Sequence, residues 1–428
     1  MKNITVKHRL LKGDIKIPPS KSLAHRAIIA AALSEEESIL YNIQYSRDII
    51  ATINIMRSLG ASIIEADNNT LHINGTGFFN SQTTENLLQC DESGSTLRFL
   101  VPVALVKGGN FTFDGKGKLK ERPMKPYYDI FNEKNISYNS SSGLPLRVMG
   151  KLESGRYSLP GNVSSQFITG LMFALPLLDG DSIIHITTEL ESKAYVDLTM
   201  QVLRKFGIEI INRDYREFIV HGNQQYTACR DSIEGDFSQG AFYLVAGAIG
   251  SDINCRGLDI ESLQGDKAIL DILRSMGCRL DITEQYIKAL PSVTNGVDID
   301  VSQCPDLVPV LGVLGCMSKG RTRILNAGRL RYKECDRLMA TASELNKLGG
   351  KITELEDSLI IEGIDSFHGG HVDSHNDHRI AMALSIAATR ATGEVIIDNP
   401  MTINKSYPDF YKDYVTLGGD IDGLDNRR

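Results

Sequence analysis

Internal repetition is the feature that most restricts how this chain can fold. Six times along its 428 residues, a helical run ends in an apolar residue followed by Gly, or once by Asn, and a strand-like stretch follows. A residue with positive φ commonly follows the last turn of a helix, and Gly and Asn tolerate that conformation best. The marker residues lie 75, 72, 70, 72 and 69 residues apart and are Gly60, Asn135, Gly207, Gly277, Gly349 and Gly418.

A second marker repeats at nearly the same interval in its own register. A polar residue precedes an unusually apolar helix six times, with spacings of 73, 69, 74, 68 and 71 residues. These residues are Ser22, Ser95, Ser164, Ser238, Asp306 and Asp377. The two markers agree on a unit of about 71 residues, one sixth of the chain.

Each unit has the pattern strand, buried helix, strand, amphipathic helix and two strands, with hairpins expected at 63–73 and 352–361. Such units are too large for a solenoid of short repeats. We therefore predict an α/β protein with two lobes, each made of three βαβαββ repeats with buried helices inside and sheets outside. The predicted lobes are residues 1–20 plus 229–428, and residues 21–228, with hinges near 18–20 and 230–235.

Composition narrows the classes of function. The net charge is −7, whereas a general nucleic-acid binder is usually basic, so we expect no nucleic-acid partner. We also expect no membrane contact, because no apolar run reaches about 18 residues and the first residues lack the apolar core of a signal peptide. Seven widely spaced Cys without a CxxC motif are typical of free thiols in a reducing compartment. These features predict a cytoplasmic protein.

Cations are concentrated where buried helices are expected to begin, as with Lys21, Arg26, Arg98 and Arg379. Helix N-termini carry unpaired N–H groups and a partial positive charge, so they attract anions. Ser and Asp at these starts are also explained as ordinary N-caps. N-capping does not explain the Lys and Arg residues, which the helix dipole disfavours by about 0.3–1 kcal/mol each. We therefore expect an anionic ligand in a positive cleft between the lobes.

Other chemistries have weaker support. The stretch 115–120 resembles a phosphate-binding loop but lacks the GxxxxGK[ST] order, and neither GxSxG nor a GxGxxG after a strand occurs. The His-rich fragment HGGHVDSHNDH (368–378) could bind a metal ion. No second carboxylate or Cys cluster at fixed spacing supports such a site.

Seven motifs occur in an order that is typical of one family. They are PPSKSLAHRA (18–27), ESGSTLR (92–98), KERPM (120–124), SSQF (164–167), KECDRL (333–338), NDHRIAM (376–382) and NKSYPDF (404–410). Together they resemble the motifs of the 3-phosphoshikimate 1-carboxyvinyltransferases, or EPSP synthases, over essentially the whole chain. The resemblance implies a two-lobed, inside-out α/β barrel fold. It also implies transfer of the enolpyruvyl group of phosphoenolpyruvate to the 5-hydroxyl of shikimate 3-phosphate, in the pathway to chorismate and the aromatic amino acids.

The resemblance also assigns residues by motif, and both implied substrates are polyanions, as the cations require. Phosphoenolpyruvate would contact Lys21, Gly94, Arg122, Gln166, Arg337, Arg379 and Lys405. Shikimate 3-phosphate would contact Lys21, Ser22, Arg26, Ser164, Ser165, Gln166, Ser192, Asp306 and Lys333. Neither cofactor nor metal is implied, and one site per chain suggests that a monomer suffices.

The implied reaction needs acid–base groups, because a hydroxyl loses a proton while a vinyl CH2 gains one. General acid–base catalysis contributes roughly 10²–10⁴-fold. The resemblance assigns these roles to Asp306 and Glu334, with Lys21 as a third catalytic residue. Without the resemblance, Asp306 fits a helix N-cap and Glu334 fits a surface residue of a charged stretch. The spacing of three places Glu334 and Arg337 on one helix face.

The chain departs from the family pattern at three positions. Glu92 and Arg329 each stand where Asn is common, and Ser95 stands where Thr is common. We expect Arg329 to add a cation near the shikimate phosphate and Glu92 to pair with a nearby cation.

Two other functions stay open. The related UDP-N-acetylglucosamine enolpyruvyl transferases usually have Lys-Asn at the Lys21–Ser22 position and a reactive Cys in a loop. Here the pair is Lys-Ser and residues 118–122 contain no Cys. A non-catalytic polyanion-binding protein is the other alternative, and the presence of Lys21, Asp306 and Glu334 argues against it.

Overall fold

The chain forms two compact units in a computed structural model that describes residues 2–67, 69–80, 87–140 and 143–424. The continuous unit is Pro19–Glu234, and the split unit combines Met1–Pro18 with Gly235–Arg428. The chain thus passes between the units after residues 18 and 234, whereas the sequence placed these boundaries after residues 20 and 228. Within the described ranges, no helix has the length and hydrophobicity needed to cross a lipid bilayer.

The described residues of each unit form three four-stranded sheets that share one topology. In the continuous unit they are β14 (Arg230–Ser232), β3 (Ser38–Tyr41), β5 (Thr70–Asn74) and β4 (Ser62–Ala66); β6 (Leu87–Gln89), β7 (Gly109–Asp114), β9 (Leu146–Gly150) and β8 (Ser137–Asn139); and β10 (Arg156–Leu159), β11 (Ser182–Ile186), β13 (Glu217–Val220) and β12 (Ile210–Arg213). In the split unit they are β2 (Lys12–Lys16), β15 (Asp252–Arg256), β17 (Ile287–Ala289) and β16 (Leu280–Ile282); β18 (Asp298–Asp300), β19 (Arg321–Leu325), β21 (Leu359–Glu362) and β20 (Lys351–Glu354); and β22 (Gly370–Asp373), β23 (Val395–Asp398), β1 (Asn3–Lys7) and β24 (Asp420–Asp422).

The pairing within each sheet follows the predicted repeat. In the order given, the first strand runs parallel to the second, and the other two pairs are antiparallel, as in β10–β11–β13–β12. In the pairs β6–β7, β10–β11, β18–β19 and β22–β23 the two parallel strands enclose one buried helix in the sequence, because parallel strands need a long crossover connection. The two predicted hairpins are confirmed as β4–β5 and β20–β21.

The helices fall into a buried set and an outer set. The buried helices are α1 (Lys21–Ala31), α4 (Gly94–Lys107), α6 (Ser165–Ala174), α8 (Phe237–Ala248), α10 (Val308–Cys316) and α12 (His378–Ala388). The others are α2 (Arg47–Ser58), α3 (Thr76–Asn80), α5 (Lys125–Glu133), α7 (Lys193–Lys205), α9 (Ile269–Ser275), α11 (Arg337–Lys347) and α13 (Phe410–Thr416). Short 3₁₀ turns are η1 (Gly117–Glu121), η2 (Leu175–Leu177), η3 (Gly265–Ala268), η4 (Pro305–Leu307), η5 (Gly328–Tyr332) and η6 (Pro400–Lys405).

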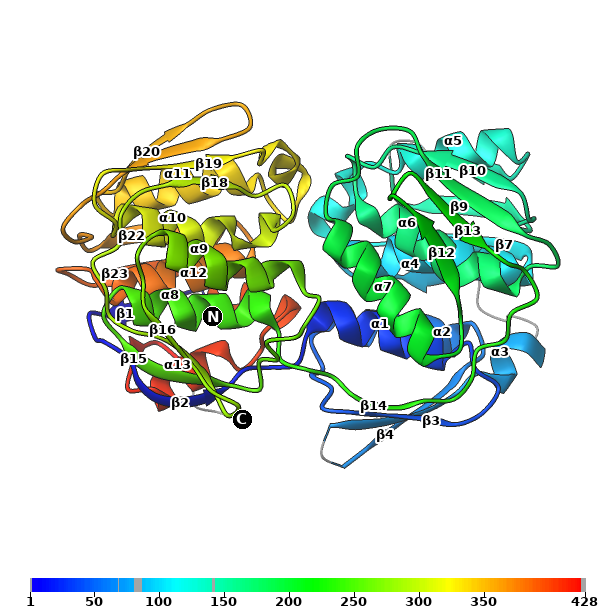
Figure 1. The fold of residues 1–428 in the computed structure, drawn as a ribbon, viewed down its shortest axis with the longest axis horizontal. Coiled ribbons are helices and arrows are strands. Elements are labelled where there is room, and N and C mark those ends of the chain that lie inside the picture. Colours follow the sequence, from blue (N-terminus) through cyan, green and yellow to red (C-terminus); the bar gives the residue numbers. More distant parts are fainter. Residues whose placement is uncertain (1, 68, 81–86, 141–142, 425–428) are drawn as a thin grey trace. The chain divides into compact units, whose positions relative to one another are not determined.

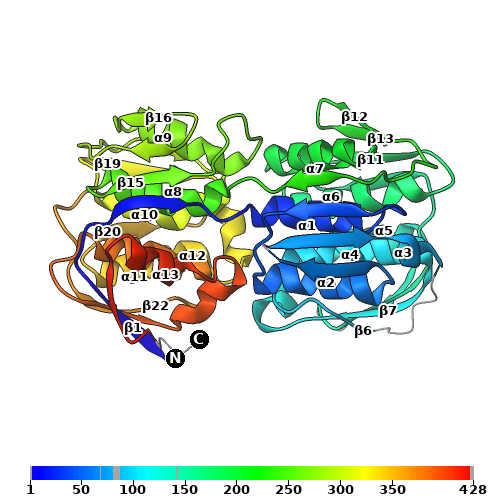
Figure 2. The same ribbon diagram turned by 90° about the horizontal axis from the view of Figure 1, so that it is seen from below.

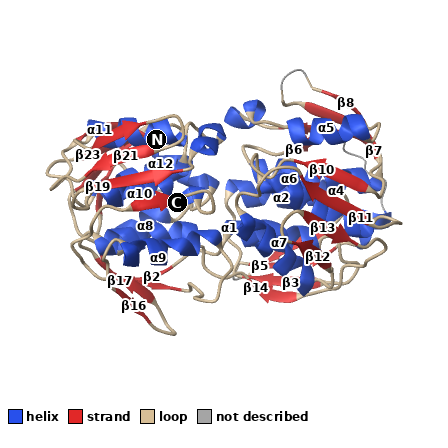
Figure 3. Cartoon of the chain, turned by 45° about the horizontal axis from the view of Figure 1, so that its top comes forward, coloured by secondary structure: helices blue, strands red, loops and turns tan. Residues whose placement is uncertain are grey.

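In each unit the helices lie inside and the strands lie toward the outside (Figures 1 and 3). In the split unit, α8, α10 and α12 contact one another, and every residue of these three helices is buried. A helix that is apolar on all sides requires such a position. The prediction of inner helices and outer sheets is therefore confirmed for each unit.

The first sequence marker has the expected backbone conformation at all six positions. Their φ angles are 107°, 55°, 78°, 88°, 87° and 88° for Gly60, Asn135, Gly207, Gly277, Gly349 and Gly418. The second marker needs a correction at three positions. Ser22, Ser95 and Ser238 lie inside the first turn, because Ser20, Ser93 and Asp236 cap these helices.

Two strands pair in a sheet of one unit although the helix that follows each of them in the sequence lies in the other unit. β2, which precedes α1 in the sequence, pairs with β15, while β14, which precedes α8, pairs with β3. Strand β1 completes another sheet of the split unit between β23 and β24. Figure 2 shows the blue N-terminal segment beside these late elements of the chain. The sequence had indicated that the first residues join the later part of the chain.

Close packing of α4 against α6 generates a prediction at Gly170. A methyl group at this position would collide with the carbonyl oxygen of Arg98 and the hydroxyl of Tyr127. We expect Gly170→Ala to lower the free energy of unfolding by about 1–3 kcal/mol, as overpacked cores do. Urea denaturation measures this change. Arg204→Ala, at an exposed position of α7, is the control, and an equal effect of both variants would contradict the packing role.

Candidate active site

Polar side chains gather at the N-terminal ends of the buried helices in the split unit. Asp306 lies in η4 immediately before α10, and Asp377 caps α12 by accepting a hydrogen bond from the backbone N–H of Arg379, at 2.8 Å. Helix α8 begins at Asp236, whose carboxylate accepts from the backbone N–H of Ser238, at 2.8 Å. The first turns of these three helices therefore form one polar cluster above an apolar core.

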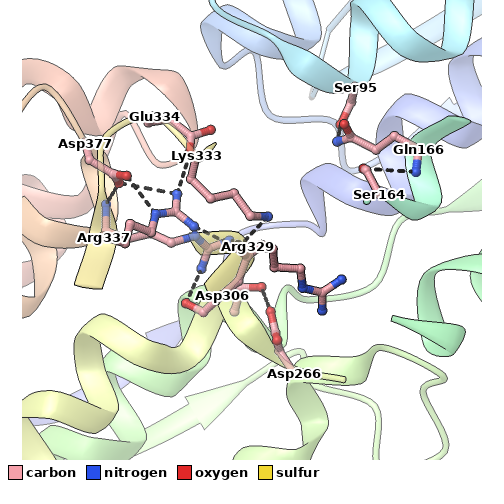
Figure 4. Close-up of polar contacts among 12 residues, drawn as sticks. Ser95, Ser164, Gln166, Asp266, Asp306, Arg329, Lys333, Glu334, Arg337 and Asp377 are labelled. Atoms are coloured by element: carbon pink, nitrogen blue, oxygen red, sulfur yellow. Dashed lines mark hydrogen bonds and ion pairs between the residues drawn. The ribbon is translucent and has the colours of Figure 1, made fainter. Parts of the chain in front are cut away.

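Arg337 is the centre of this cluster (Figure 4). It is the first residue of α11, and its side chain is only 2% exposed. Its guanidinium donates to three carboxylates: to Asp377 from Nε at 2.7 Å, to Asp306 from Nη1 at 2.8 Å and to Glu334 from Nη2 at 2.6 Å. Burial alone would lower the pKa of Arg337, but these carboxylates outweigh it and raise the pKa. The guanidinium is therefore a fixed positive charge.

Asp306 is held by cations from three elements. Arg337 Nη1, Arg379 Nη2 and Lys333 Nζ approach its carboxylate at 2.8, 3.1 and 3.3 Å. Burial would raise the pKa of Asp306, but Arg379, Lys333 and Arg337 hold it well below its usual value. The interpretation of Asp306 as a helix N-cap is wrong, since the side chain binds these cations. An ionised carboxylate in such surroundings can accept a proton or orient a cation.

Glu334 is a half-buried member of the cluster, with 14% of its side chain exposed, so its interpretation as an exposed surface residue is also wrong. The expected shared helix face is wrong as well. Asp336 caps α11 and Glu334 lies in the turn before it, because the Asp336 carboxylate accepts from the N–H of Met339 at 3.0 Å. Glu334 therefore pairs with Arg337 although Glu334 lies outside helix α11.

Lys333 and Lys405 contribute two further ammonium groups. Burial lowers the pKa of Lys333, with Asp306 acting in the opposite direction. Lys405, in η6, is 3% exposed, and its Nζ donates to the backbone carbonyl of Asn376 at 2.6 Å. That carbonyl lies one residue before Asp377, so Lys405 contacts the turn that leads into α12.

Asp266 is a carboxylate that the sequence did not single out. It lies in η3, is 2% exposed and accepts a hydrogen bond from the Ser238 hydroxyl. Its Oδ1 atom is buried, with no hydrogen-bond partner among the described residues. Burial and the charge of Asp306 raise the pKa of Asp266 to about 7, against the opposing effect of Arg379. A second, partly protonated carboxyl group therefore lies close to Asp306.

In the continuous unit, Gln166 connects the starts of α4 and α6 (Figure 4). Its Nε2 donates to Ser95 Oγ at 2.9 Å, and its Oε1 accepts from Arg98 Nη1 at 2.8 Å. Arg122 lies close by, because a Cβ added at Gly94 would be 2.7 Å from Arg122 Nη1. Ser95 makes its contact with Gln166 through its hydroxyl group. The additional methyl group of threonine, the residue common in the family, is not needed for this contact.

Helix α1 contributes a second set of cations. Lys21 Nζ forms an ion pair with Asp48 Oδ2 at 2.8 Å. Arg26 is 2% exposed, and it donates from Nε to Thr199 Oγ1 at 2.8 Å and from Nη1 to the carbonyl of Ser22 at 2.7 Å. Burial lowers the pKa of Arg26 to about 10, so the guanidinium stays charged at neutral pH.

Three predicted serines lie at the starts of two helices. Ser164 caps α6, its hydroxyl accepting from the N–H of Gln166 at 3.3 Å, and Ser165 follows as a buried residue. Ser192 precedes α7 in a left-handed conformation, with φ of 56°, and is 3% exposed. These hydroxyls lie at helix ends with a partial positive charge, as an oxyanion requires.

Two of the three departures from the family pattern lie in charged surroundings. Arg329 donates from Nη2 to the backbone carbonyl of Ser302, and it lowers the pKa of Lys333 in addition to burial. Glu92 lies against the loop at Gly117, where an added Cβ would be 2.6 Å from Glu92 Oε2. The effect of either residue on a ligand stays a prediction.

Asp48, Arg98, Asp266 and Asp377 are the polar residues that the site prediction left out. Asp377 and Arg98 belong to motifs already quoted, so their sequence positions carried a signal. Asp48 and Asp266 lie outside those motifs, and only the fold brings them to Lys21 and Ser238. Among the described residues, no group of three or more His, Cys, Asp or Glu side chains could hold a metal ion.

The fold and these two clusters define the class of protein: a two-unit α/β protein with cations and buried carboxylates at its helix starts, suited to small polyanions. The family model of EPSP synthase (3-phosphoshikimate 1-carboxyvinyltransferase) matches residues 6–414. The chain therefore belongs to the EPSP synthase family.

Curated relatives agree with the family match. The chain is 55% identical over 415 residues to the 3-phosphoshikimate 1-carboxyvinyltransferase of Clostridium acetobutylicum, covering 96% of both chains. It is also 55% identical over 432 residues to that of Clostridium novyi, covering 99% of both. EPSP synthase of Acinetobacter baumannii shares the fold, with a TM-score of 0.81, 24% identity and coverage of 98% of this chain and 100% of that one.

The raised pKa of Asp266 generates a stability prediction. In the folded state Asp266 titrates near pH 7, while its unperturbed pKa is 3.8, so the folded protein binds the proton more tightly. Stability must therefore fall as the pH rises through this window. We expect Asp266→Asn to remove that loss, so that its unfolding free energy relative to wild type rises by roughly 1 kcal/mol per pH unit between about pH 4 and 7. Urea denaturation at several pH values measures it.

The control is Asp271→Asn, because the Asp271 side chain on α9 is 83% exposed. A flat difference between Asp266→Asn and wild type across this pH range would show that Asp266 is ionised in the folded state.

The close approach of Arg122 to Gly94 generates a second prediction. Gly94→Ala places a methyl group 2.7 Å from Arg122 Nη1, so the guanidinium must move. We expect the KM for phosphoenolpyruvate to rise at least threefold, with stability nearly unchanged because Arg122 is a flexible side chain. Steady-state kinetics and thermal unfolding measure both quantities. An unchanged KM would show that Arg122 does not contribute to phosphoenolpyruvate binding.

Proposed function

We propose that this protein, a transferase by family, moves the enolpyruvyl group of phosphoenolpyruvate to the 5-hydroxyl of shikimate 3-phosphate. The products are 5-enolpyruvylshikimate 3-phosphate and inorganic phosphate, on the route to chorismate and the aromatic amino acids. The observation that carries the proposal is the family match over residues 6–414, within which the predicted acid–base residues lie in one charged cluster.

We assign shikimate 3-phosphate to the hydroxyls and cations of the continuous unit together with Asp306 and Lys333. The starts of α1, α6 and α7 supply Lys21, Ser22, Arg26, Ser164, Ser165, Gln166 and Ser192. Backbone N–H groups and the helix dipole at these starts favour a phosphate dianion. Arg26 is held by Thr199 and by the carbonyl of Ser22, so its guanidinium is already oriented before a ligand binds.

We assign phosphoenolpyruvate to residues of both units. Lys21, Gly94, Arg122 and Gln166 belong to the continuous unit, and Arg337, Arg379 and Lys405 belong to the split unit. Arginine suits the planar carboxylate and the phosphate because it donates two parallel hydrogen bonds. Lysine contributes a compact charge for the departing phosphate.

The reaction proceeds by addition and then elimination. In the addition, the 5-hydroxyl oxygen bonds to C2 of phosphoenolpyruvate, the hydroxyl proton leaves and C3 gains a proton, giving a tetrahedral ketal phosphate. In the elimination, C3 loses a proton and the C2–O bond to phosphate breaks, which forms the product vinyl group. Asp306 is suited to accept the proton of the hydroxyl group because the neighbouring cations keep its carboxylate ionised. Glu334 is suited to transfer the proton to and from C3.

One phosphate-release assay tests the function. Phosphoenolpyruvate is supplied with shikimate 3-phosphate or with UDP-N-acetylglucosamine, and release is expected with the first acceptor only. Release with the second acceptor would identify the related transferase activity, and tight binding without release would indicate a non-catalytic polyanion-binding protein. We further propose that the chain acts as a cytoplasmic monomer without cofactor or metal, since one chain supplies every assigned residue. Size-exclusion chromatography with light scattering tests the monomer.

Glu334→Gln tests the assigned proton transfer. A glutamine oxygen can still accept from Arg337 Nη2, so the cluster should stay intact, but it cannot exchange a proton. We expect kcat to fall roughly 10²-fold or more, about 2.7 kcal/mol, with little change in substrate affinity. Calorimetry measures binding and phosphate release measures turnover.

Glu362→Gln is the matched control, because Glu362, on β21 of the same unit, pairs with the exposed Arg321 on β19. Near-normal turnover in Glu334→Gln would leave Lys21 and Asp306 as the proton-transfer groups.

A further inference from the structure

The His-rich fragment 368–378 has a role that the proposed function leaves unassigned. Two of its histidines contact carboxylates on different parts of the split unit. His371 Nε2 lies 2.9 Å from Asp398, at an exposed position, and His375 Nε2 lies 2.8 Å from Glu344. The pair of His375 and Glu344 joins the segment before α12 to helix α11, whose first residue is Arg337.

Glu344 is a buried acceptor that holds this segment. It is 1% exposed, and besides His375 it accepts from Lys347 Nζ at 2.8 Å and from the backbone N–H of Asp373 at 2.9 Å. Burial would raise the pKa of Glu344, but the bonds from His375, Lys347 and Asp373 outweigh it and lower the pKa to about 2. The carboxylate is therefore ionised at every pH at which the protein would work.

The turn after His375 has an unusual backbone. His375 and Asn376 have φ angles of 51° and 55°, and the N–H of Asp377 donates to the carbonyl of Ser374 at 2.9 Å. Two successive positive φ angles with this hydrogen bond are the geometry of a type I′ turn. Non-glycine residues keep such a conformation only when the surroundings hold it. Glu344 holds the side chain of His375, and Lys405 holds the carbonyl of Asn376.

This turn positions the Asp377 carboxylate for its contacts with Arg337 and with the first turn of α12. Asp377 follows Asn376 directly, accepts from Arg337 Nε at 2.7 Å and caps α12 at the N–H of Arg379. A turn that relaxes would therefore displace the carboxylate that orients Arg337 and would loosen the first turn that carries Arg379. Both arginines are assigned to phosphoenolpyruvate, so the inference rests on the proposed function.

We propose that His375, through its ion pair with Glu344, is a positioning residue that holds the turn at Ser374–Asp377 and thereby orients Arg337 and Arg379 for the anionic groups of phosphoenolpyruvate. His375 does not touch the substrate. It acts through Asp377, so the largest effect is expected on the substrate that the two arginines bind.

The proposal has a pH dependence of known sign. The charged groups that face His375 are Glu344 and Lys347 on α11 and Asp373 on β22. The hydrogen bond to Glu344 raises the pKa of His375 above 6.5, while burial opposes the rise. The pairing is therefore complete below pH 6.5 and weakens as the pH rises through the higher, folded-state pKa. The kcat/KM for phosphoenolpyruvate should fall over the same interval.

His375→Asn is the sharpest test, because asparagine tolerates a left-handed turn but is too short to reach Glu344. We expect the KM for phosphoenolpyruvate to rise about tenfold at pH 6, the scale of one hydrogen bond to a charged group. The KM for shikimate 3-phosphate should change less than twofold. The decline of kcat/KM that we expect for the wild type above pH 6.5 should be absent in the variant. Glu344→Gln should reproduce both effects.

His371→Asn is the matched control, since His371 belongs to the same fragment and pairs with Asp398 without contacting the turn. It should retain wild-type KM values and pH profile. If His375→Asn lowers only the melting temperature, or changes the KM of both substrates equally, the pair is merely structural and the proposal is overturned.

Failure of the proposed function would be visible separately, as a wild-type protein that releases no phosphate. Calorimetric titration with phosphoenolpyruvate then decides the inference. Weaker binding by His375→Asn than by wild type supports it, and equal or undetectable binding in both proteins overturns it.

Discussion

The burial of three mutually contacting helices in the split unit is the constraint from which its charged cluster follows. Ser238 in the first turn of α8 donates to Asp266, while Asp306 before α10 and Asp377 at the cap of α12 both accept from Arg337. Helix ends that point the same way bring their partial positive charges together. Carboxylates at these starts offset that charge within the protein, and an anionic substrate offsets it from outside.

Arg337 shows why the cluster is a single cooperative element. A buried guanidinium that loses one of its carboxylates leaves a charge uncompensated, which is far more costly than losing an exposed ion pair. Asp306, Glu334 and Asp377 come from the loop before α10, the turn before α11 and the cap of α12. The site geometry therefore depends on the relative positions of two neighbouring repeats, because α10 and α11 belong to one repeat and α12 to the next, and strain in one connecting turn reaches the others through Arg337.

The sequence predicted the repeats, the inner helices and most of the charged residues because each leaves a local signature: glycine after a helix, an apolar run, a cation at a helix start. Contacts between residues far apart in the sequence left no such signature. Asp266 and Asp48 look like ordinary acidic residues, and only folding brings them to Ser238 and Lys21. The assumed helical face of Glu334 failed for a local reason, since Asp336 is the better cap and starts the helix later.

The exchange of strands has a consequence for how the protein is made. Strands β1 and β2 are synthesised well before their partners β15, β23 and β24, which lie beyond residue 250. The whole continuous unit lies between β2 and β15 in the sequence, so β2 stays unpaired until β15 has been made, and β1 stays unpaired until β23 has been made. Such long-range pairing is slow and leaves strand edges open to other chains. A nascent chain of this protein is thus exposed to misassembly at β1 and β2 until their partner strands have been made.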